Sequence, residues 1–348
     1  MPRRFSSQVF VKQTNLLING QFVPSISGKT FKTYNPATEE KIADVAEAGS
    51  SDIDAAVAVA RAAFKGSWRT LPAADRGRLL NKLADLFEEK IDELAVFKAV
   101  DNGKPCAEAK GADFGPLCSR LTVTMLDGPK RFVALLSRSQ DLNCAIPSPS
   151  LSLGPALAAG NIIVLKLGEQ TPLSALRVGE LIVEAGVVNI VPGVAGPYLA
   201  QHPNVDKVAF FTGSTEVGYQ IMRESHVNNI KRVTLELGGK SANIILEEIF
   251  GPVMSVFKFK TIDQVIERAN DSVYGLRAGV VTKSIDNAIK ISNGIQTVYV
   301  NGYDVFDANT PFGGFKDSGI GRENGELGLR NYLQYKTVIM KRPDDSMP

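Results

Sequence analysis

The sequence has few of the side chains that build covalent frameworks or metal centres. Its 348 residues include three cysteines, Cys106, Cys118 and Cys144, and two histidines, His202 and His226. Three cysteines are too few for a disulfide framework, and neither residue type shows the spacing of a zinc site. The sequence therefore predicts a protein of a reducing compartment that holds no structural metal.

An excess of either charge is also missing. The chain has 39 Lys and Arg residues against 37 Asp and Glu residues, a formal net charge of +2 with no long run of one sign. It therefore lacks the electrostatic footprint of a protein that binds nucleic acid or an anionic membrane. The longest apolar stretch, Leu151 to Leu167, contains Gly, Pro, Asn and Lys and cannot serve as a membrane span. We expect a small-molecule partner, with no nucleic acid and no membrane.

The first residues are basic and contain no acid. MPRRFSSQVFVKQ carries Arg3, Arg4 and Lys12 together with serines. This composition is typical of a disordered basic tail, and it is also similar to the end of a mitochondrial presequence. The predicted location is the cytoplasm, with the mitochondrial matrix as the alternative.

Strand and helix patterns alternate along most of the chain. Asn19-Gly20 predicts a hairpin over residues 16–23, since Asn-Gly is the favoured type I′ pair. Apolar residues at helical spacing predict a helix from Ser51 to Phe64 and a longer one after Pro72 that ends near Asn102-Gly103. Residues 111–153 show no sustained period and receive no assignment.

Order returns in the second half of the sequence. The predicted elements are a strand at 162–165, a helix at 172–185, strands at 187–191 and 205–211, and a helix after Gly213. This alternation predicts an α/β fold with a doubly wound, mostly parallel sheet. Ligands bind such sheets at the carboxyl ends of the strands.

Two predicted strand ends carry residues suited to a ligand. An apolar strand runs into Gly213-Ser214-Thr215 and then a helix, so backbone N–H groups and a hydroxyl at a helix N-terminus could hold a pyrophosphate. The alternative is an ordinary glycine turn with a capping hydroxyl. Lys166 ends another strand, with Glu169 three residues on, and this pair could hydrogen-bond the hydroxyls of a ribose. Taken alone, such a lysine is usually solvated.

Several ordered motifs, read together, carry a family resemblance. The chain contains NPATEE at 35–40, GPALAAGN at 154–161, VTLELGGKSANII at 233–245, EEIFGPV at 247–253 and PFGGFKDSGIGRENGELGL at 311–329. In this order they resemble the NAD(P)-dependent aldehyde dehydrogenase superfamily, in particular its tetrameric NAD-dependent class. The resemblance spans about residues 15 to 110 and 154 to 341.

The resemblance implies roles for individual residues. Lys166 and Glu169 would bind the adenosine ribose of the coenzyme, and Gly213 and Ser214 would line its pyrophosphate site. Glu236 in LELGG matches the general base, with a surface strand carboxylate as the alternative reading. From EEIFGPV, Glu248 matches the residue that holds the nicotinamide ribose and Phe250 the residue at the nicotinamide ring. NAD is the expected coenzyme; NADP is possible, although Glu169 would repel a 2′-phosphate.

The sequence departs from the family pattern at the nucleophile. In complete members, a long segment containing a nucleophilic cysteine separates GGKS from EEIFGPV, whereas here Ile245, Leu246 and Glu247 join the two motifs directly. No cysteine follows Cys144. The oxyanion-stabilising asparagine of the family's IPWNFP segment is also absent, because residues 146–150 read IPSPS. A recruited Cys144 is the one conceivable substitute.

The expected architecture is an internally truncated family member. It comprises a coenzyme domain over 1–240 (with 111–153 irregular and partly an oligomerisation segment), a remnant catalytic domain over 241–328 and an oligomerisation tail over 329–348. Residues 335–341 (YKTVIMK) resemble the family's sheet-pairing strand, so the partners expected are a small-molecule aldehyde and either a homo-oligomer, as in a homotetramer, or a mixed oligomer with full-length subunits.

Oxidation of an aldehyde to an acid with NAD(P)⁺ is the family function, and we expect this chain to show little of it. Three readings remain open. The chain is an incomplete product of a locus that encodes an ordinary dehydrogenase, a non-catalytic homologue that binds coenzyme or pairs with subunits, or a chain that does not fold stably because its truncation exposes apolar faces.

Overall fold

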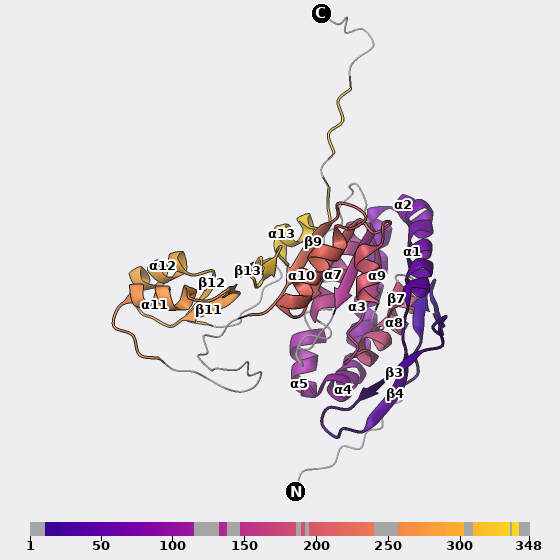
Figure 1. Ribbon diagram of the computed structural model, residues 1–348, viewed down its shortest axis with the longest axis horizontal. Helices are drawn as coiled ribbons and strands as arrows, with labels where there is room; N and C mark the ends of the chain where they lie inside the picture. The colour runs from indigo at the N-terminus through magenta and orange to yellow at the C-terminus, as the bar shows by residue number, and fades with distance from the viewer. Residues whose placement is uncertain are drawn as a thin grey trace, which may run out of the picture.

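The protein forms a large α/β body and a smaller α/β body beside it (Figure 1). The computed structural model describes residues 11–114, 132–137, 147–185, 189–191, 195–239, 257–302, 309–334 and 336–340. Within these residues, no helix is long and apolar enough to cross a membrane, and no group of three or more His, Cys, Asp or Glu side chains could hold a metal ion.

The large body begins with a strand-rich entry followed by helices. Its first elements are β1 (Leu16–Ile18), β2 (Gln21–Val23), β3 (Thr30–Tyr34), β4 (Lys41–Ala46), α1 (Ser50–Lys65), α2 (Ser67–Thr70), α3 (Ala73–Glu89), α4 (Ile91–Asn102), α5 (Cys106–Glu108) and the π-helix η1 (Ala109–Phe114). The predicted hairpin is confirmed: β1 and β2 pair antiparallel, and Asn19 and Gly20 both have positive φ, as a type I′ turn requires.

The second half of the large body alternates strand and helix as predicted. Its elements are β5 (Phe132–Ser137), α7 (Pro147–Ala158), β6 (Ile162–Lys166), α8 (Leu173–Ala185), β7 (Asn189–Val191), α9 (Gly196–Gln201), β8 (Lys207–Thr212), α10 (Thr215–Ser225) and β9 (Arg232–Glu236). Strands β9, β8, β5, β6 and β7 are neighbours in that order and all run parallel. The predicted doubly wound sheet is therefore present.

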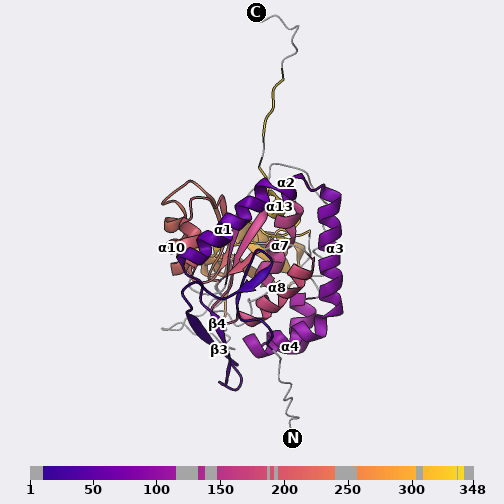
Figure 2. The same cartoon turned by 90° about the vertical axis from the view of Figure 1, so that its right-hand side faces the viewer.

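Alternate residues of strand β6 point into two separate cores. Ile163 and Leu165 pack with residues of α3, α7 and α8, whereas Val164 packs with residues of α1 and α9. All three side chains are buried, as expected for a strand covered on both faces. Figure 2 shows α1 and α3 as separate layers around the sheet.

Two sequence-based expectations are corrected. The single helix predicted from Pro72 to Asn102 is two helices, α3 and α4, because Lys90 between them has a non-helical backbone (φ −101°, ψ 12°). The unassigned region contains β5, the strand at the centre of the parallel sheet. Residues 132–137 form a short apolar run without alternation of apolar and polar residues, so no strand signal could be recognised there.

A buried carboxylate connects α4 to the helix that follows β6. Asp101 accepts hydrogen bonds from the backbone N–H and the hydroxyl of Ser174, both at 2.8 Å, at the N-terminus of α8. Burial raises the pKa of Asp101 to about 6, although the hydrogen bonds from Ser174 act to lower it. This contact fixes the start of α8, the helix that follows β6 in the chain.

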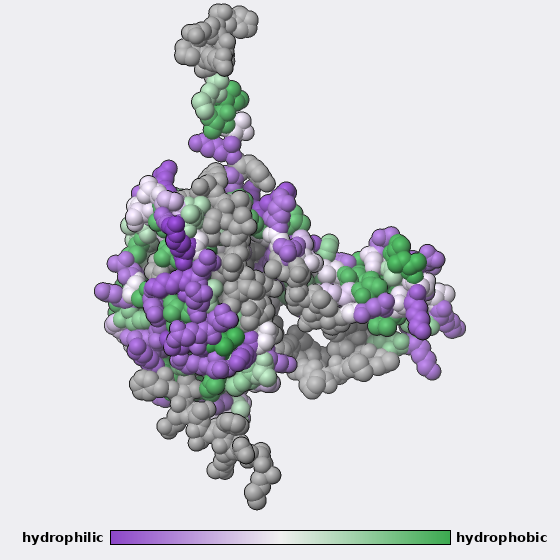
Figure 3. Space-filling view, turned by 180° about the vertical axis from the view of Figure 1, so that it is seen from behind, coloured by the Kyte–Doolittle hydropathy of each residue, from purple (hydrophilic) through white to green (hydrophobic). Residues whose placement is uncertain are grey.

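The smaller body comprises α11 (Ile262–Asn270), β10 (Tyr274–Gly275), β11 (Arg277–Val280), α12 (Ile285–Gly294) and β12 (Thr297–Val300). Strands β11 and β12 form a two-stranded parallel sheet. No residue of α11 is buried, and Val281 and Ile285 are among the exposed large apolar side chains. Figure 3 shows apolar side chains on the surface of this body. Two parallel strands are too few to enclose a core.

The C-terminal segment returns to the large body. It contains β13 (Phe315–Lys316), β14 (Gly319–Ile320) and α13 (Gly325–Arg330), and β14 pairs antiparallel with β9 at the edge of the main sheet. Tyr332 is buried in the large core, so residues up to this point pack as part of the large body. Residues 336–340 are exposed and project away from it (Figure 1).

Candidate functional site

The parallel sheet changes winding direction next to its central strand. From β5 the chain proceeds to β6 and β7 on one side, and then crosses to β8 and β9 on the other side of β5. In doubly wound sheets, a crevice forms at such a switch point, outside the carboxyl ends of the strands. A ligand site is therefore expected at the carboxyl ends of β6, β8 and β9.

Lys166 and Glu169 lie together at the end of β6, as expected from their spacing. The ammonium of Lys166 and the carboxylate of Glu169 form an ion pair with an Nζ–Oε1 distance of 2.5 Å. The Lys166 side chain is only 4% exposed and that of Glu169 is 29% exposed. A lysine this deeply buried differs from the solvated lysine of the alternative reading. The ammonium of the pair can donate hydrogen bonds to a ligand, and the carboxylate can accept them.

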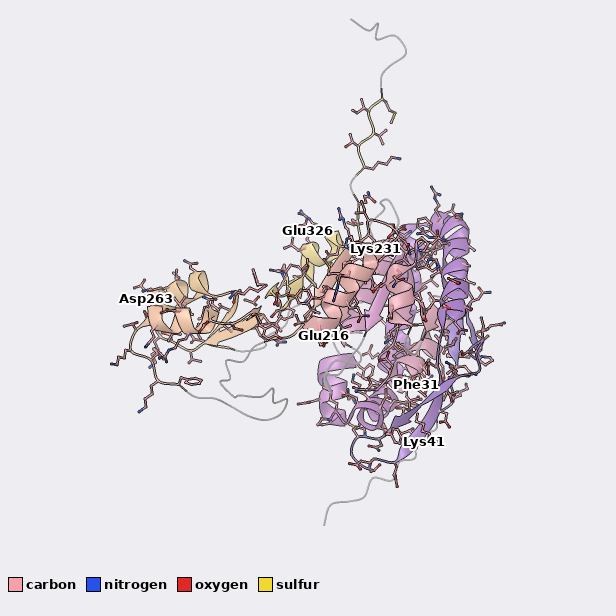
Figure 4. The ribbon with its side chains drawn as sticks, in the orientation of Figure 1. Phe31, Lys41, Glu216, Lys231, Asp263 and Glu326 are labelled. Atoms are coloured by element: carbon pink, nitrogen blue, oxygen red, sulfur yellow. The ribbon has the colours of Figure 1, made fainter. Side chains whose placement is uncertain are left out.

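Gly213 and Ser214 lie at the end of β8, where α10 begins. The N–H of Gly213 donates to the backbone carbonyl of Glu236 at 3.2 Å, which joins this turn to β9. Ser214 is the N-cap of α10, and its hydroxyl accepts from the N–H of Val217 at 3.3 Å. The N–H groups of a first helical turn have no partner within the helix backbone, so they can bind an anion. Figure 4 shows Glu216 in this first turn.

These two groups lie within reach of one extended ligand. Strands β6 and β8 both pair with β5, so their ends are separated by two strand spacings, roughly 10 Å. The ammonium of Lys166 can donate to a ligand hydroxyl and the carboxylate of Glu169 can accept from one, whereas the N-terminus of α10 favours an anion. The edge is therefore suited to a ligand that carries a sugar and a phosphate.

Glu236 ends β9, the next strand along the same edge. It lies opposite Thr212 of β8 and Gly319 of β14. Its Oε1 atom is shielded from solvent and has no hydrogen-bond partner. Burial raises the pKa of Glu236 to about 7, and the positive charges of Arg277 and Arg322 act in the opposite direction. Glu236 as a whole is partly exposed, but one oxygen of its carboxyl is shielded from solvent, unlike that of a solvated surface carboxylate.

The raised pKa makes the stability of the fold depend on pH. In the unfolded chain, a glutamate titrates near 4.5, so the folded state binds the proton more tightly. The contribution of Glu236 to stability is complete below pH 4.5 and is lost as the pH rises through about 7. The loss amounts to roughly 3 kcal/mol, because a change of one in pKa corresponds to about 1.4 kcal/mol.

Glu236→Gln should remove this dependence. We expect the variant to gain stability over the parent chain as the pH rises from 5 to 8, by up to about 3 kcal/mol. Urea unfolding at four pH values measures the difference. Glu88→Gln, at an exposed position of α3, is the control and should run parallel to the parent chain. A constant difference between Glu236→Gln and the parent chain would contradict the account.

The remaining residues of the predicted site and the cysteines differ in whether the structure describes them. Glu248 and Phe250, expected at the nicotinamide end, lie outside the described residues, as do Cys118 and Cys144. Cys106 is exposed at the start of α5. Sequence reasoning gave no role to Arg277 or Arg322. Arg322 falls in the quoted GIGREN motif, whereas nothing in the sequence around Arg277 signals its electrostatic effect on Glu236.

The chain matches the family model described as "Aldehyde dehydrogenase family" over residues 22–126, 143–248 and 244–338. The chain belongs to the aldehyde dehydrogenase family. It is 36% identical to the mitochondrial aldehyde dehydrogenase of Mesocricetus auratus over 490 positions, which cover 98% of this chain and 96% of that protein. It is 37% identical to aldehyde dehydrogenase 1A1 of Gallus gallus over 481 positions, with coverage of 96% and 94%.

The fold is that of solved aldehyde dehydrogenases. The NAD⁺ complex of the enzyme from Bacillus cereus superposes with a TM-score of 0.85 at 33% identity, covering 96% of this chain and 98% of that chain. An alignment of 490 positions cannot be filled by 348 residues, so this aldehyde dehydrogenase is shorter than its relatives through internal gaps. The second and third matched segments of the family model meet at residues 244–248.

Proposed function

We propose that this chain is an NAD-binding member of the aldehyde dehydrogenase family that carries out little or no aldehyde oxidation. One observation carries the proposal. The ends of β6 and β8 keep an ion pair and a helix N-terminus suited to a dinucleotide, whereas no cysteine follows Cys144 in the sequence. The coenzyme part of the family's site is retained without its nucleophile.

The residues at the sheet edge fit NAD. Lys166 and Glu169 would take the adenosine ribose, with the ammonium donating to one hydroxyl and the carboxylate accepting from another. Gly213 and Ser214, with the first-turn N–H groups of α10, would take the pyrophosphate. A carboxylate at the ribose favours NAD over NADP because it repels a 2′-phosphate. When bound, the coenzyme supplies a hydride acceptor.

Glu236 retains the properties of a general base. A pKa of about 7 lets its carboxyl take up or release a proton near neutral pH, where a buried base is most effective. In the family, this carboxylate activates the water that releases the acid from a thioester. The thioester first requires attack of a thiolate on the aldehyde carbon, and that step has no assigned residue in this chain.

The position of the gap supports the loss of the nucleophile. The family match passes from its second to its third segment at residues 244–248, where the GGKS motif is joined to EEIFGPV. The family's cysteine belongs to the long segment between these motifs. We infer that this segment is absent from the chain. Glu248 and Phe250 keep their proposed places at the nicotinamide ribose and ring.

Subunit pairing is the second candidate function, and the exposed C-terminal segment favours it. Val338 is 60% exposed, Ile339 85% and Met340 86%, although all three are apolar. An extended apolar segment of this kind can pair with a sheet edge of another subunit. The partner would be a second copy, as in a homotetramer, or a full-length aldehyde dehydrogenase in the cytoplasm or, as the alternative location, the mitochondrial matrix.

Titration calorimetry with NAD and NADP tests the coenzyme proposal. We expect NAD to bind the purified chain and NADP to bind at least tenfold more weakly. ADP-ribose should bind with an affinity close to that of NAD, because the proposed contacts involve the ribose and the pyrophosphate. An absence of binding for all three compounds, in a preparation shown to be folded by circular dichroism, would reject the proposal.

A further inference from the structure

A tight turn between β13 and β14 lies where the smaller body meets the main sheet. It comprises Lys316, Asp317 and Ser318, and it is closed by the N–H of Ser318, which donates to the carbonyl of Phe315 at 3.0 Å. Lys316 has a positive φ of 49°, a conformation that few side chains adopt. Figure 1 shows β13 between the smaller body and α10. Several polar groups of this 316–318 turn bond to the segments on its two sides.

Towards the smaller body, the turn bonds to the chain that follows α11. The ammonium of Lys316 donates to the carbonyl of Asn270 at 2.8 Å and to that of Ser272 at 2.9 Å. The N–H of Asp317 donates to the carbonyl of Val273 at 3.0 Å. These hydrogen bonds attach the turn to residues 270–273.

Ser318 joins the smaller body to the main sheet. It is fully buried, and its hydroxyl accepts from the N–H of Gly275 in β10 at 2.9 Å. Its backbone carbonyl accepts from the N–H of Leu237, which follows β9, also at 2.9 Å. A buried N–H that loses its partner is destabilising, because it cannot bond to water instead. Removal of the Ser318 hydroxyl should therefore loosen the turn.

The same turn supports the first residue of α10. Thr215 begins this helix, and its hydroxyl donates to the carbonyl of Asp317 at 3.4 Å. Further along the helix, Gly218 packs directly on Leu237, since an added Cβ would lie 2.6 Å from both methyl carbons of that side chain. The N-terminus of α10 is thus held by the turn directly and, through Leu237, indirectly.

We propose that the 316–318 turn positions the N-terminus of α10 for the pyrophosphate of the coenzyme, with Thr215 and Ser318 as positioning residues. The inference rests on the proposed NAD site and deepens it. Backbone N–H groups bind an anion well only when the first helical turn is held in place, because each donor must point at an oxygen. Docking of the smaller body on the turn is then a condition for tight coenzyme binding.

Titration calorimetry on the full chain with ADP-ribose and with adenosine tests the inference. Thr215→Val and Ser318→Ala should each weaken binding of ADP-ribose by about 3- to 10-fold, the effect of one lost hydrogen bond. Adenosine carries no phosphate and should bind both variants like the parent chain, because its proposed contacts are with Lys166 and Glu169. Thr215→Ser, which keeps the hydroxyl, should restore the affinity for ADP-ribose.

Ser225→Ala is the matched control. Ser225 ends α10 and is fully buried like Ser318, but its hydroxyl has no hydrogen-bond partner. This variant should bind ADP-ribose like the parent chain. Parent-like affinity for ADP-ribose in Thr215→Val and Ser318→Ala would overturn the inference, and so would an equal loss of affinity for adenosine. Should Ser318→Ala not fold, the comparison of Thr215→Val with Thr215→Ser decides the matter.

Amide exchange measured by NMR without ligand separates this inference from the NAD proposal. The N–H of Gly218 donates to the carbonyl of Ser214 at 2.9 Å, the first hydrogen bond of α10. Its exchange should be faster in Thr215→Val and Ser318→Ala than in the parent chain and in Ser225→Ala. Unchanged exchange would contradict the inference even if NAD binds. A parent chain that binds no ADP-ribose, with variants that show this acceleration, would reject the NAD proposal alone.

Discussion

Replacing Lys166 with methionine is expected to weaken NAD binding by about 10- to 100-fold. The change removes a charged donor to a ribose hydroxyl, and such hydrogen bonds contribute about 1.5 to 3 kcal/mol. It also leaves Glu169 without the ion pair that orients its carboxylate. Because methionine fills much of the same buried volume, the fold should persist. Titration calorimetry with NAD measures the effect.

Lys41→Met provides the matched control for this prediction. Lys41 forms an ion pair with Asp44 at 2.7 Å, with the same three-residue spacing, but both side chains are about half exposed. Figure 4 shows Lys41 on the strand-rich entry, away from Glu216 at the start of α10. The control should bind NAD like the parent chain. Equal affinities for the two variants would mean that Lys166 does not contact the coenzyme.

Gly319→Ala should destabilise the chain by about 3 to 5 kcal/mol. Gly319 has φ +134°, a conformation that side chains rarely adopt, and an added Cβ would lie 2.1 Å from the carbonyl oxygen of Leu235. The clash is with backbone, so relief requires β14 to separate from β9. Separation would also remove the segment that carries Arg322 from Glu236. Urea unfolding followed by circular dichroism gives the loss.

Gly196→Ala is the control for the glycine variant. Gly196 begins α9, does not have positive φ and has no atom within 4 Å of an added Cβ. Its replacement should change the free energy of unfolding by less than about 1 kcal/mol. If Gly319→Ala unfolds at the same urea concentration as this control, the described pairing of β14 with β9 is wrong.

Much of the large body could be predicted from sequence because its signals are local. Asn19-Gly20 specified the hairpin, and the apolar runs around Ile163 and Val208 specified two parallel strands. The carboxyl ends of these strands then had to share an edge, which brought Lys166 and Ser214 to the same side of the sheet. Those inferences needed only periodicity and the topology of a doubly wound fold.

The central strand could not be predicted in the same way. Residues 132–137 form a strand by pairing with β6 and β8, which lie 25 or more residues away in the sequence. Their position depends on that tertiary pairing, whereas the local sequence shows no alternation to mark it. The helix break at Lys90 could not be predicted either, because no glycine or proline marks that position in the sequence.

The environment of Glu236 also depends on distant segments. Sequence reasoning identified the carboxyl from its motif, but Arg277 and Arg322 come from positions more than 40 residues further along the chain. Neither has a spacing relation to Glu236 that sequence periodicity could reveal. Their effect on the pKa of Glu236 requires β14 to pair with β9 and the smaller body to pack at Gly238.

The smaller body is the weakest part of the fold. Its two parallel strands and the helices α11 and α12 leave Val281, Ile285 and Ile289 exposed, and α11 buries none of its residues. A body with so small a core gains little stability from burial. This observation agrees with the reading in which truncation uncovers apolar faces.

The most direct test of the central claim is NADH formation by the purified chain, free of full-length subunits, from acetaldehyde and NAD at pH 8. The account predicts that the absorbance of NADH does not rise above that of a sample without enzyme, in a preparation that binds NAD by calorimetry. Turnover at a rate comparable with complete family members would contradict it, and abolition of that turnover by Cys144→Ser would show that a cysteine outside the expected segment had taken the role of the nucleophile.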